Sequence, residues 1–65
     1  MTLKEFVSRY NAGEKIKDCY YIKTAFGKKY IHHVESDWWV VSGNGFGRQS
    51  YSCIPQTEVF LKEGL

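Results

Sequence analysis

Apolar side chains recur at helical spacing near the start of the chain, at Leu3, Phe6, Val7 and Tyr10. Residues three and four apart share one face of a helix, so this spacing predicts an amphipathic helix over residues 2–11. Thr2 and Glu5 add the pattern of a capping box, in which the threonine hydroxyl accepts a hydrogen bond from the Glu5 amide. A helix this short is marginal alone in water, so its apolar face must lie on a sheet.

After a polar connector, the pattern changes to short runs of aromatic and β-branched residues broken by turn residues, which is typical of strands. The runs predict strands at about residues 19–25, 29–35, 38–42, 49–54 and 58–61. Pro55 ends the fourth strand, because proline cannot donate to a ladder. For the last strand, a helical turn over 57–63 is the alternative, since Glu58 and Lys62 stand four residues apart.

The turns between the first three strands decide which side chains share a face. The turns are expected at residues 26–28 and 36–37, but the sequence determines neither register, and so leaves open which of Trp38 and Trp39 is buried. A three-residue turn at 26–28 would pair Ile22 with Tyr30, and a two-residue turn at 36–37 would pair Val34 with Trp39. One face would then hold Tyr20, Ile22, Tyr30, His32, Val34, Trp39 and Val41. The other would hold Tyr21, Lys23, Ile31, His33, Trp38 and Val40. A slip of one residue in a hairpin moves all side chains of a strand to the opposite face.

The order of elements predicts one small α+β domain over residues 1–65, with an N-terminal helix packed on a bent antiparallel meander of four to five strands. Both expected faces of the meander are apolar, and one short helix covers only one of them. The other face then closes into a barrel, forms a dimer interface or binds a partner. An SH3-like or Sm-like small barrel is the leading elaboration, by analogy of element order alone.

Composition changes this picture only slightly. A chain of 65 residues has a marginal core, and its aromatic content of 17% favours dense aromatic packing as the compensation. The net charge of +2 permits contact with nucleic acid without requiring it. No apolar run has the length of a signal peptide or a membrane span, so we expect a cytoplasmic protein without a membrane partner. Cys19 and Cys53 would be reduced in that compartment.

Three kinds of chemistry are disfavoured by the sequence. The glycine-rich stretch 43–47 precedes a strand, whereas a phosphate-binding loop precedes a helix. His32 and His33 are neighbours in an expected strand and should point to opposite faces, and no CxxC or HxxxH spacing supports a metal. A sheet this small leaves little room for a pocket of about 300 Å³ or more. We therefore expect no enzyme activity, no cofactor, no metal and no small-molecule substrate.

The candidate binding residues are aromatic and basic side chains of the meander and the glycine-rich loop. They are Tyr21, Lys23, Lys28, Lys29, Trp38, Phe46 and Arg48. Tryptophan, tyrosine and arginine dominate protein-binding hot spots, whereas lysines interleaved with aromatic rings are typical of nucleic-acid surfaces.

Two functions compete for these residues. The first is a small regulatory protein, an inhibitor or adaptor, that binds another protein or a second copy of itself through exposed Trp38, Tyr21 and Phe46 with Arg48. The second is a nucleic-acid-binding module that uses Lys23, Lys28, Lys29 and Arg48 with the same rings. The first is preferred, because the mild net charge gives little long-range field. The small size alone hints at a phage or mobile-element origin.

Overall fold

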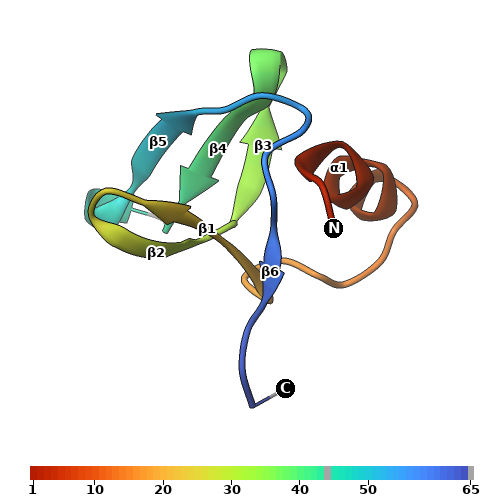
Figure 1. The fold of residues 1–65 in the computed structure, drawn as a ribbon, viewed down its shortest axis with the longest axis horizontal. Coiled ribbons are helices and arrows are strands. Elements are labelled where there is room, and N and C mark those ends of the chain that lie inside the picture. Colours follow the sequence, from red (N-terminus) through yellow and green to blue (C-terminus); the bar gives the residue numbers. More distant parts are fainter. Residues whose placement is uncertain (44, 65) are drawn as a thin grey trace.

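The computed structural model describes residues 1–43 and 45–64 (Figure 1). Helix α1 (Leu3–Asn11) is followed by strands β1 (Tyr20–Thr24), β2 (Gly27–Tyr30), β3 (His33–Glu35), β4 (Trp39–Ser42), β5 (Gln49–Ser52) and β6 (Phe60–Leu61). Short 3-10 turns occupy Ser36–Trp38 and Gly45–Gly47. The α+β class with an N-terminal helix is confirmed. Among the helices of the described residues, none is long and apolar enough to cross a membrane.

The strands form two antiparallel three-stranded sheets, with the orders β2-β1-β6 and β3-β4-β5. The two residues between β2 and β3 connect the sheets. The amide of Ile31 donates to the carbonyl of Tyr20, the first residue of β1, and the amide of His32 donates to the carbonyl of Val41 in β4, each over 2.8 Å. One bent segment, expected as a single strand over 29–35, therefore serves both sheets. In the described part of the chain neither sheet closes, so the barrel is not confirmed.

The start of α1 is held by the chain between β5 and β6, which lies beside it in Figure 1. The Thr2 hydroxyl accepts from the Glu5 amide over 3.2 Å, as the capping box predicts. The amides of Leu3 and Lys4 donate to the carbonyls of Thr57 (2.8 Å) and Pro55 (3.0 Å). These first-turn amides have no acceptor within a helix, so the late segment satisfies them.

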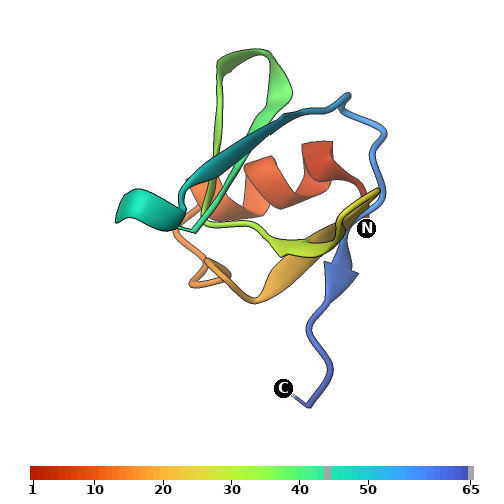
Figure 2. The same cartoon turned by 90° about the vertical axis from the view of Figure 1, so that its left-hand side faces the viewer.

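The core lies where α1 meets the two sheets and consists of Leu3, Phe6, Ile22, Ile31, Val40 and Val59. Phe6 is fully buried and meets Tyr20 edge to face, with 5.9 Å between ring centroids. Ile22 comes from the first sheet and Val40 from the second. The helix therefore covers one end of the space between the sheets, as the two views together show (Figures 1 and 2).

The register of the first hairpin differs from the prediction. The turn contains only Ala25 and Phe26, so Thr24 pairs with Gly27, Tyr21 with Tyr30 and Ile22 with Lys29. Gly27 has a φ of 100°, a conformation that only glycine adopts readily. The expected pairing of Ile22 with Tyr30 is therefore wrong, and Tyr30 shares a face with Tyr21.

The second turn is longer by one residue than predicted. Glu35 pairs with Trp39 and Val34 with Val40, which leaves three residues in the turn. Two of them, Asp37 and Trp38, have positive φ angles of 58° and 64°. Because of the slip, Val40 turns into the core and Trp39 is 43% exposed. Trp38 is half-buried and packs against the core, so it is less exposed than a binding anchor should be, and Trp39 is the more exposed of the two tryptophans, a choice that the sequence left open.

Candidate nucleic-acid interface

Three aromatic rings cross the outer face of the β2-β1-β6 sheet. Tyr21 of β1 pairs with Tyr30 of β2 on one side and with Phe60 of β6 on the other. Its ring centroid lies 5.5 Å from each neighbour, edge to face with Tyr30 and stacked on Phe60. Cross-strand aromatic pairs stabilise a sheet, so the row is a rigid apolar stripe across all three strands.

A lysine stands two residues from each ring, on the same face of the sheet because side chains alternate along a strand. Each ammonium lies over a ring of another strand of the sheet, in the geometry of a cation–π contact. Lys23 and Lys28 lie over rings of adjacent strands, whereas Lys62, which directly follows β6, reaches across β1 to Tyr30 of β2. The distances from Nζ to the ring centroid are 4.4 Å for Lys23 over Phe60, 4.9 Å for Lys28 over Tyr21 and 5.5 Å for Lys62 over Tyr30. We call these six residues the lysine–aromatic face.

The positive charge of this face is not neutralised by nearby carboxylates. Within residues 1–43 and 45–64, the ion pairs join Glu5 to Arg9 and Glu35 to His33 and Arg48, and none involves the face. Lys23 and Lys28 even stand directly opposite each other in the hairpin, an arrangement that costs stability. Exposed lysines without carboxylate partners are typical of phosphate-binding surfaces, and aromatic side chains beside them are typical of surfaces on which bases stack.

Three of the predicted binding residues, Tyr21, Lys23 and Lys28, belong to the lysine–aromatic face. A fourth, Lys29, does not, because its side chain points to the opposite side of β2. Tyr21 is only 6% exposed because its neighbours cover it, so the prediction that it is exposed is wrong. Sequence reasoning overlooked Tyr30, Phe60 and Lys62. A signal existed, because an aromatic residue and a lysine stand two apart in each of the segments 21–23, 28–30 and 60–62.

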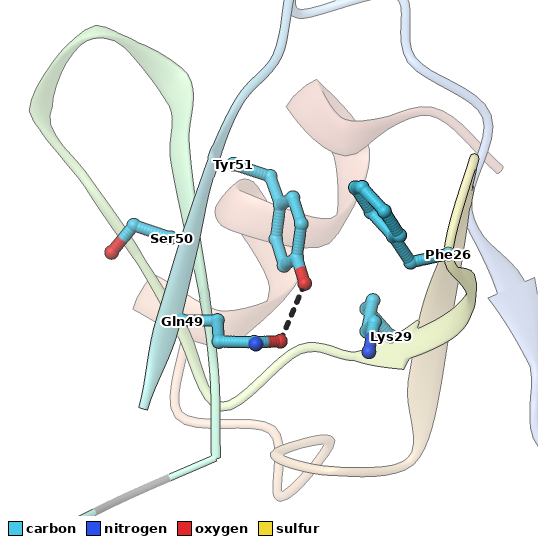
Figure 3. Close-up of a pocket in the computed structure, with 5 residues that line it drawn as sticks. All are labelled: Phe26, Lys29, Gln49, Ser50 and Tyr51. Atoms are coloured by element: carbon cyan, nitrogen blue, oxygen red, sulfur yellow. Dashed lines mark hydrogen bonds between the residues drawn. The ribbon is translucent and has the colours of Figure 1, made fainter. Parts of the chain in front are cut away.

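A groove opens between β2 of the first sheet and β5 of the second (Figure 3). It has a volume of about 580 Å³ and is lined by Phe26, Lys29, Gln49, Ser50 and Tyr51. Phe26 and Tyr51 project from its opposite walls, and Lys29 lies between them at one side (Figure 3). We call this site the mouth groove. Its volume exceeds the pocket of about 300 Å³ for which so small a sheet was expected to leave little room.

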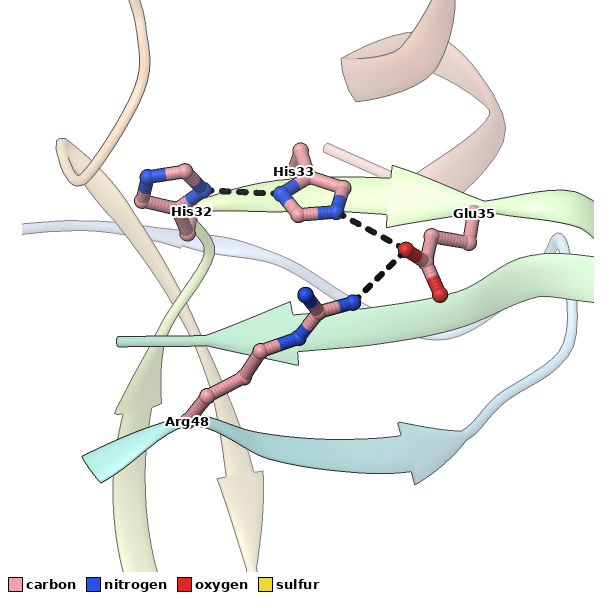
Figure 4. A network of polar contacts seen from close by, with 4 residues as sticks. All are labelled: His32, His33, Glu35 and Arg48. Atoms are coloured by element: carbon pink, nitrogen blue, oxygen red, sulfur yellow. Dashed lines mark hydrogen bonds and ion pairs between the residues drawn. The ribbon is translucent and has the colours of Figure 1, made fainter. Parts of the chain in front are cut away.

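A chain of polar contacts runs along the second sheet (Figure 4). Nδ1 of His32 lies 2.7 Å from Nδ1 of His33, whose Nε2 lies 3.2 Å from Oε2 of Glu35. Arg48 donates from Nη2 to the same carboxylate oxygen over 2.8 Å. The hydrogen bond from His33 and the charge of Arg48 hold the pKa of Glu35 below its usual value.

The two histidines correct a further prediction. His32 lies at the bend between β2 and β3 rather than inside a strand, so both rings meet on one side with centroids 5.0 Å apart. The expectation of opposite faces is therefore wrong. In the part of the chain that the structure describes, no three histidine, cysteine or acidic side chains are arranged to hold a metal.

The remaining predicted residues lie on the second sheet or at its end. Phe46 is fully exposed in the turn Gly45–Gly47, as the prediction of an exposed ring requires. Arg48 is engaged by Glu35. Both lie apart from the lysine–aromatic face, so the seven predicted residues do not form one site.

Cys19 and Cys53 are free, half-buried thiols. Burial raises the pKa of the Cys53 thiol, which keeps it protonated and poorly nucleophilic near neutral pH. This cysteine is therefore a poor candidate for a nucleophile.

Comparisons of the chain with protein-family models, with curated proteins and with solved structures gave no match.

Proposed function

We propose that this protein is a small non-enzymatic module that binds nucleic acid on its lysine–aromatic face. One observation carries the proposal: three exposed lysines without a carboxylate partner are held over a row of three rings on one sheet. The preference for a protein partner drawn from the sequence is reversed. Both functions drew on Tyr21 and Trp38, which are buried and half-buried, so the choice between them rests on the three lysines gathered on one sheet face.

Binding on this face has a simple mechanism. The ammonium groups move from the rings to phosphates, and condensed counterions leave the nucleic acid. Each cation–π contact that is given up is worth only about 0.5–1 kcal/mol at an exposed site. Stacking of one base on an uncovered ring returns about 1–3 kcal/mol. The exchange is therefore favourable for the half-buried rings of Tyr30 and Phe60.

Fluorescence anisotropy of labelled oligonucleotides, single-stranded and duplex, tests this function at about 50 and about 200 mM salt. The double variant Lys23→Glu/Lys28→Glu should lose roughly tenfold or more in affinity for both forms. Lys15→Glu/Lys17→Glu is the matched control, since it has the same net charge but alters exposed lysines of the connector. Equal losses in both variants, or no binding by the unaltered protein at low salt, would refute a role for the face.

A protein partner is the second candidate, and one observation favours it. Phe46 stands fully exposed in its turn, two residues before Arg48. Exposed aromatic and arginine side chains are typical of binding hot spots. If the partner is a second copy of the chain, sedimentation should show a dimer that Phe46→Ala dissociates. A monomer at every concentration would exclude self-association through this turn.

The finer fold assignment is also a proposal. We propose that the two sheets form an SH3-like barrel left open between β2 and β5. The bent segment shared by the sheets and the return of β6 to β1 support this assignment. An experimental structure with a partner bound would test it.

A further inference from the structure

We propose that the mouth groove admits one unpaired base, which makes single-stranded nucleic acid the preferred partner. This inference rests on the proposed function and names the substrate class for it. The lysine–aromatic face supplies the contacts with phosphate, which single strands and duplexes share. The mouth groove supplies a contact that only an unpaired base can make.

The walls of the mouth groove suit a flat ring. Tyr51 is fixed on one wall, because it packs against the core and its hydroxyl donates to Oε1 of Gln49 over 2.6 Å. Phe26 forms the opposite wall at the tip of the first hairpin and is 82% exposed (Figure 3). A base stacks on aromatic side chains at about 1–3 kcal/mol each, whatever its identity. An exposed phenylalanine opposite a fixed tyrosine is thus a clamp for a base.

The polar groups of the mouth groove fit a nucleotide as well. Lys29 is half-buried on the inner side of β2 and has no ion pair among the described residues. None of the five lining residues is acidic. A half-buried ammonium without a carboxylate partner favours the binding of an anion, here a phosphate, because the anion accepts hydrogen bonds from it and offsets its charge. Because the Gln49 amide oxygen already accepts from Tyr51, its NH2 group remains to donate to the edge of a base.

The mouth groove and the lysine–aromatic face lie on opposite sides of β2, near the tip of the first hairpin, where Phe26 lines the groove. Lys28 and Lys29 are neighbours on β2 whose side chains point to opposite sides of the strand. A strand that passes over the hairpin tip can place phosphates on Lys23 and Lys28 while one base turns in past Phe26. A duplex must first unpair and unstack that base, at a cost of a few kcal/mol. The volume of about 580 Å³ is within the usual range for ligand sites.

A single-stranded oligonucleotide with 2-aminopurine at one internal position is the probe, because stacking of this base quenches its fluorescence. The unaltered protein should quench the probe on binding and should prefer it over its duplex by roughly tenfold. Phe26→Ser should abolish the quenching and lower single-strand affinity by roughly tenfold, with duplex affinity unchanged. Ile54→Ser, at another exposed apolar side chain outside the mouth groove, is the control and should change neither quantity.

Lys29→Gln provides a second variant that removes the ammonium and leaves both rings in place. It should weaken single-strand binding more than duplex binding. Equal affinity for both forms, with no effect of Phe26→Ser, would overturn the base site while the proposed function stands. If the unaltered protein binds neither single-stranded nor duplex nucleic acid, both the base site and the proposed function are overturned. If an uncharged extended peptide displaces the oligonucleotide, and the Phe26→Ser variant no longer binds that peptide, the mouth groove is a peptide site and the base site is refuted.

Discussion

Glu35 is the residue on which the polar contacts of the second sheet converge, and its ionisation should set part of the acid sensitivity. Its folded pKa lies below the usual 4.5, mainly through the hydrogen bond from His33. A depressed pKa contributes stability that is present above the unfolded value and is lost as pH falls through the folded value. Glu35→Gln should therefore be less stable than the unaltered protein at neutral pH.

The difference between the two should shrink as pH falls below the usual glutamate range. Urea unfolding at a series of pH values measures this difference in the free energy of unfolding between Glu35→Gln and the unaltered protein. Glu14→Gln serves as the control, because Glu14 is exposed and makes no ion pair within the described residues. A gap between Glu35→Gln and the unaltered protein that stays constant from neutral to strongly acid pH would contradict the assignment.

Phe6 tests the core at the same scale. It is fully buried between the aromatic rings of Tyr10 and Tyr20, at centroid distances of 6.1 and 5.9 Å. Phe6→Ala should lose about 3–5 kcal/mol of unfolding free energy, a large share of what a small domain has. Phe46→Ala removes the same ring from a fully exposed position and should change stability by less than about 0.5 kcal/mol. Denaturant midpoints of the two variants compare them directly.

At the scale of the element, the first hairpin depends on one glycine. Gly27 has a φ of 100°, and a Cβ there would meet no atom within 4 Å. The penalty for Gly27→Ala is therefore backbone strain alone, about 1–2 kcal/mol. Gly47 has the same open surroundings without a positive φ, so Gly47→Ala should lie within about 0.5 kcal/mol of the unaltered protein. Thermal unfolding of both variants gives the comparison, and equal penalties would contradict it.

The elements also explain what could be predicted from the sequence. The helix and its cap follow from contacts within a few residues, and the period of the apolar positions reports them directly. The registers depend on single turn residues. Positive φ at Asp37 and Trp38 is uncommon for non-glycine residues, and no local pattern announces it. The length of this turn decides which of Trp38 and Trp39 is the more exposed, and the sequence left that choice open.

The candidate site was predictable only in part for a related reason. Tyr21, Lys23 and Lys28 lie on one hairpin, so local reasoning could group them. The other half of the lysine–aromatic face depends on β6 pairing with β1, a contact between residues far apart in the sequence. The mouth groove likewise needs the placement of one sheet relative to the other. Neither arrangement is encoded in the pattern of any single segment.

At the scale of the whole molecule, the low net charge of +2 makes binding depend on a few local contacts rather than on a broad field. If the three lysines of the face neutralise phosphates, the logarithm of affinity should fall with the logarithm of salt at a slope of about −2 to −3. Lys62→Gln should reduce this slope by about one, whereas Lys17→Gln in the connector should leave it unchanged. Titrations at four or more salt concentrations yield the slopes, and an unchanged slope in Lys62→Gln would remove that lysine from the interface.

The hydrogen bonds from the amides of Leu3 and Lys4 to the carbonyls of Thr57 and Pro55 affect the order in which the elements of the protein fold. During translation, the residues of α1 leave the ribosome well before the segment that satisfies its first amides exists. A nine-residue helix without those acceptors, and without the strands beneath it, frays in water. The helix is therefore fixed late although it is made before the strands beneath it, and a nascent chain presents the apolar side of α1 to chaperones until β6 has emerged.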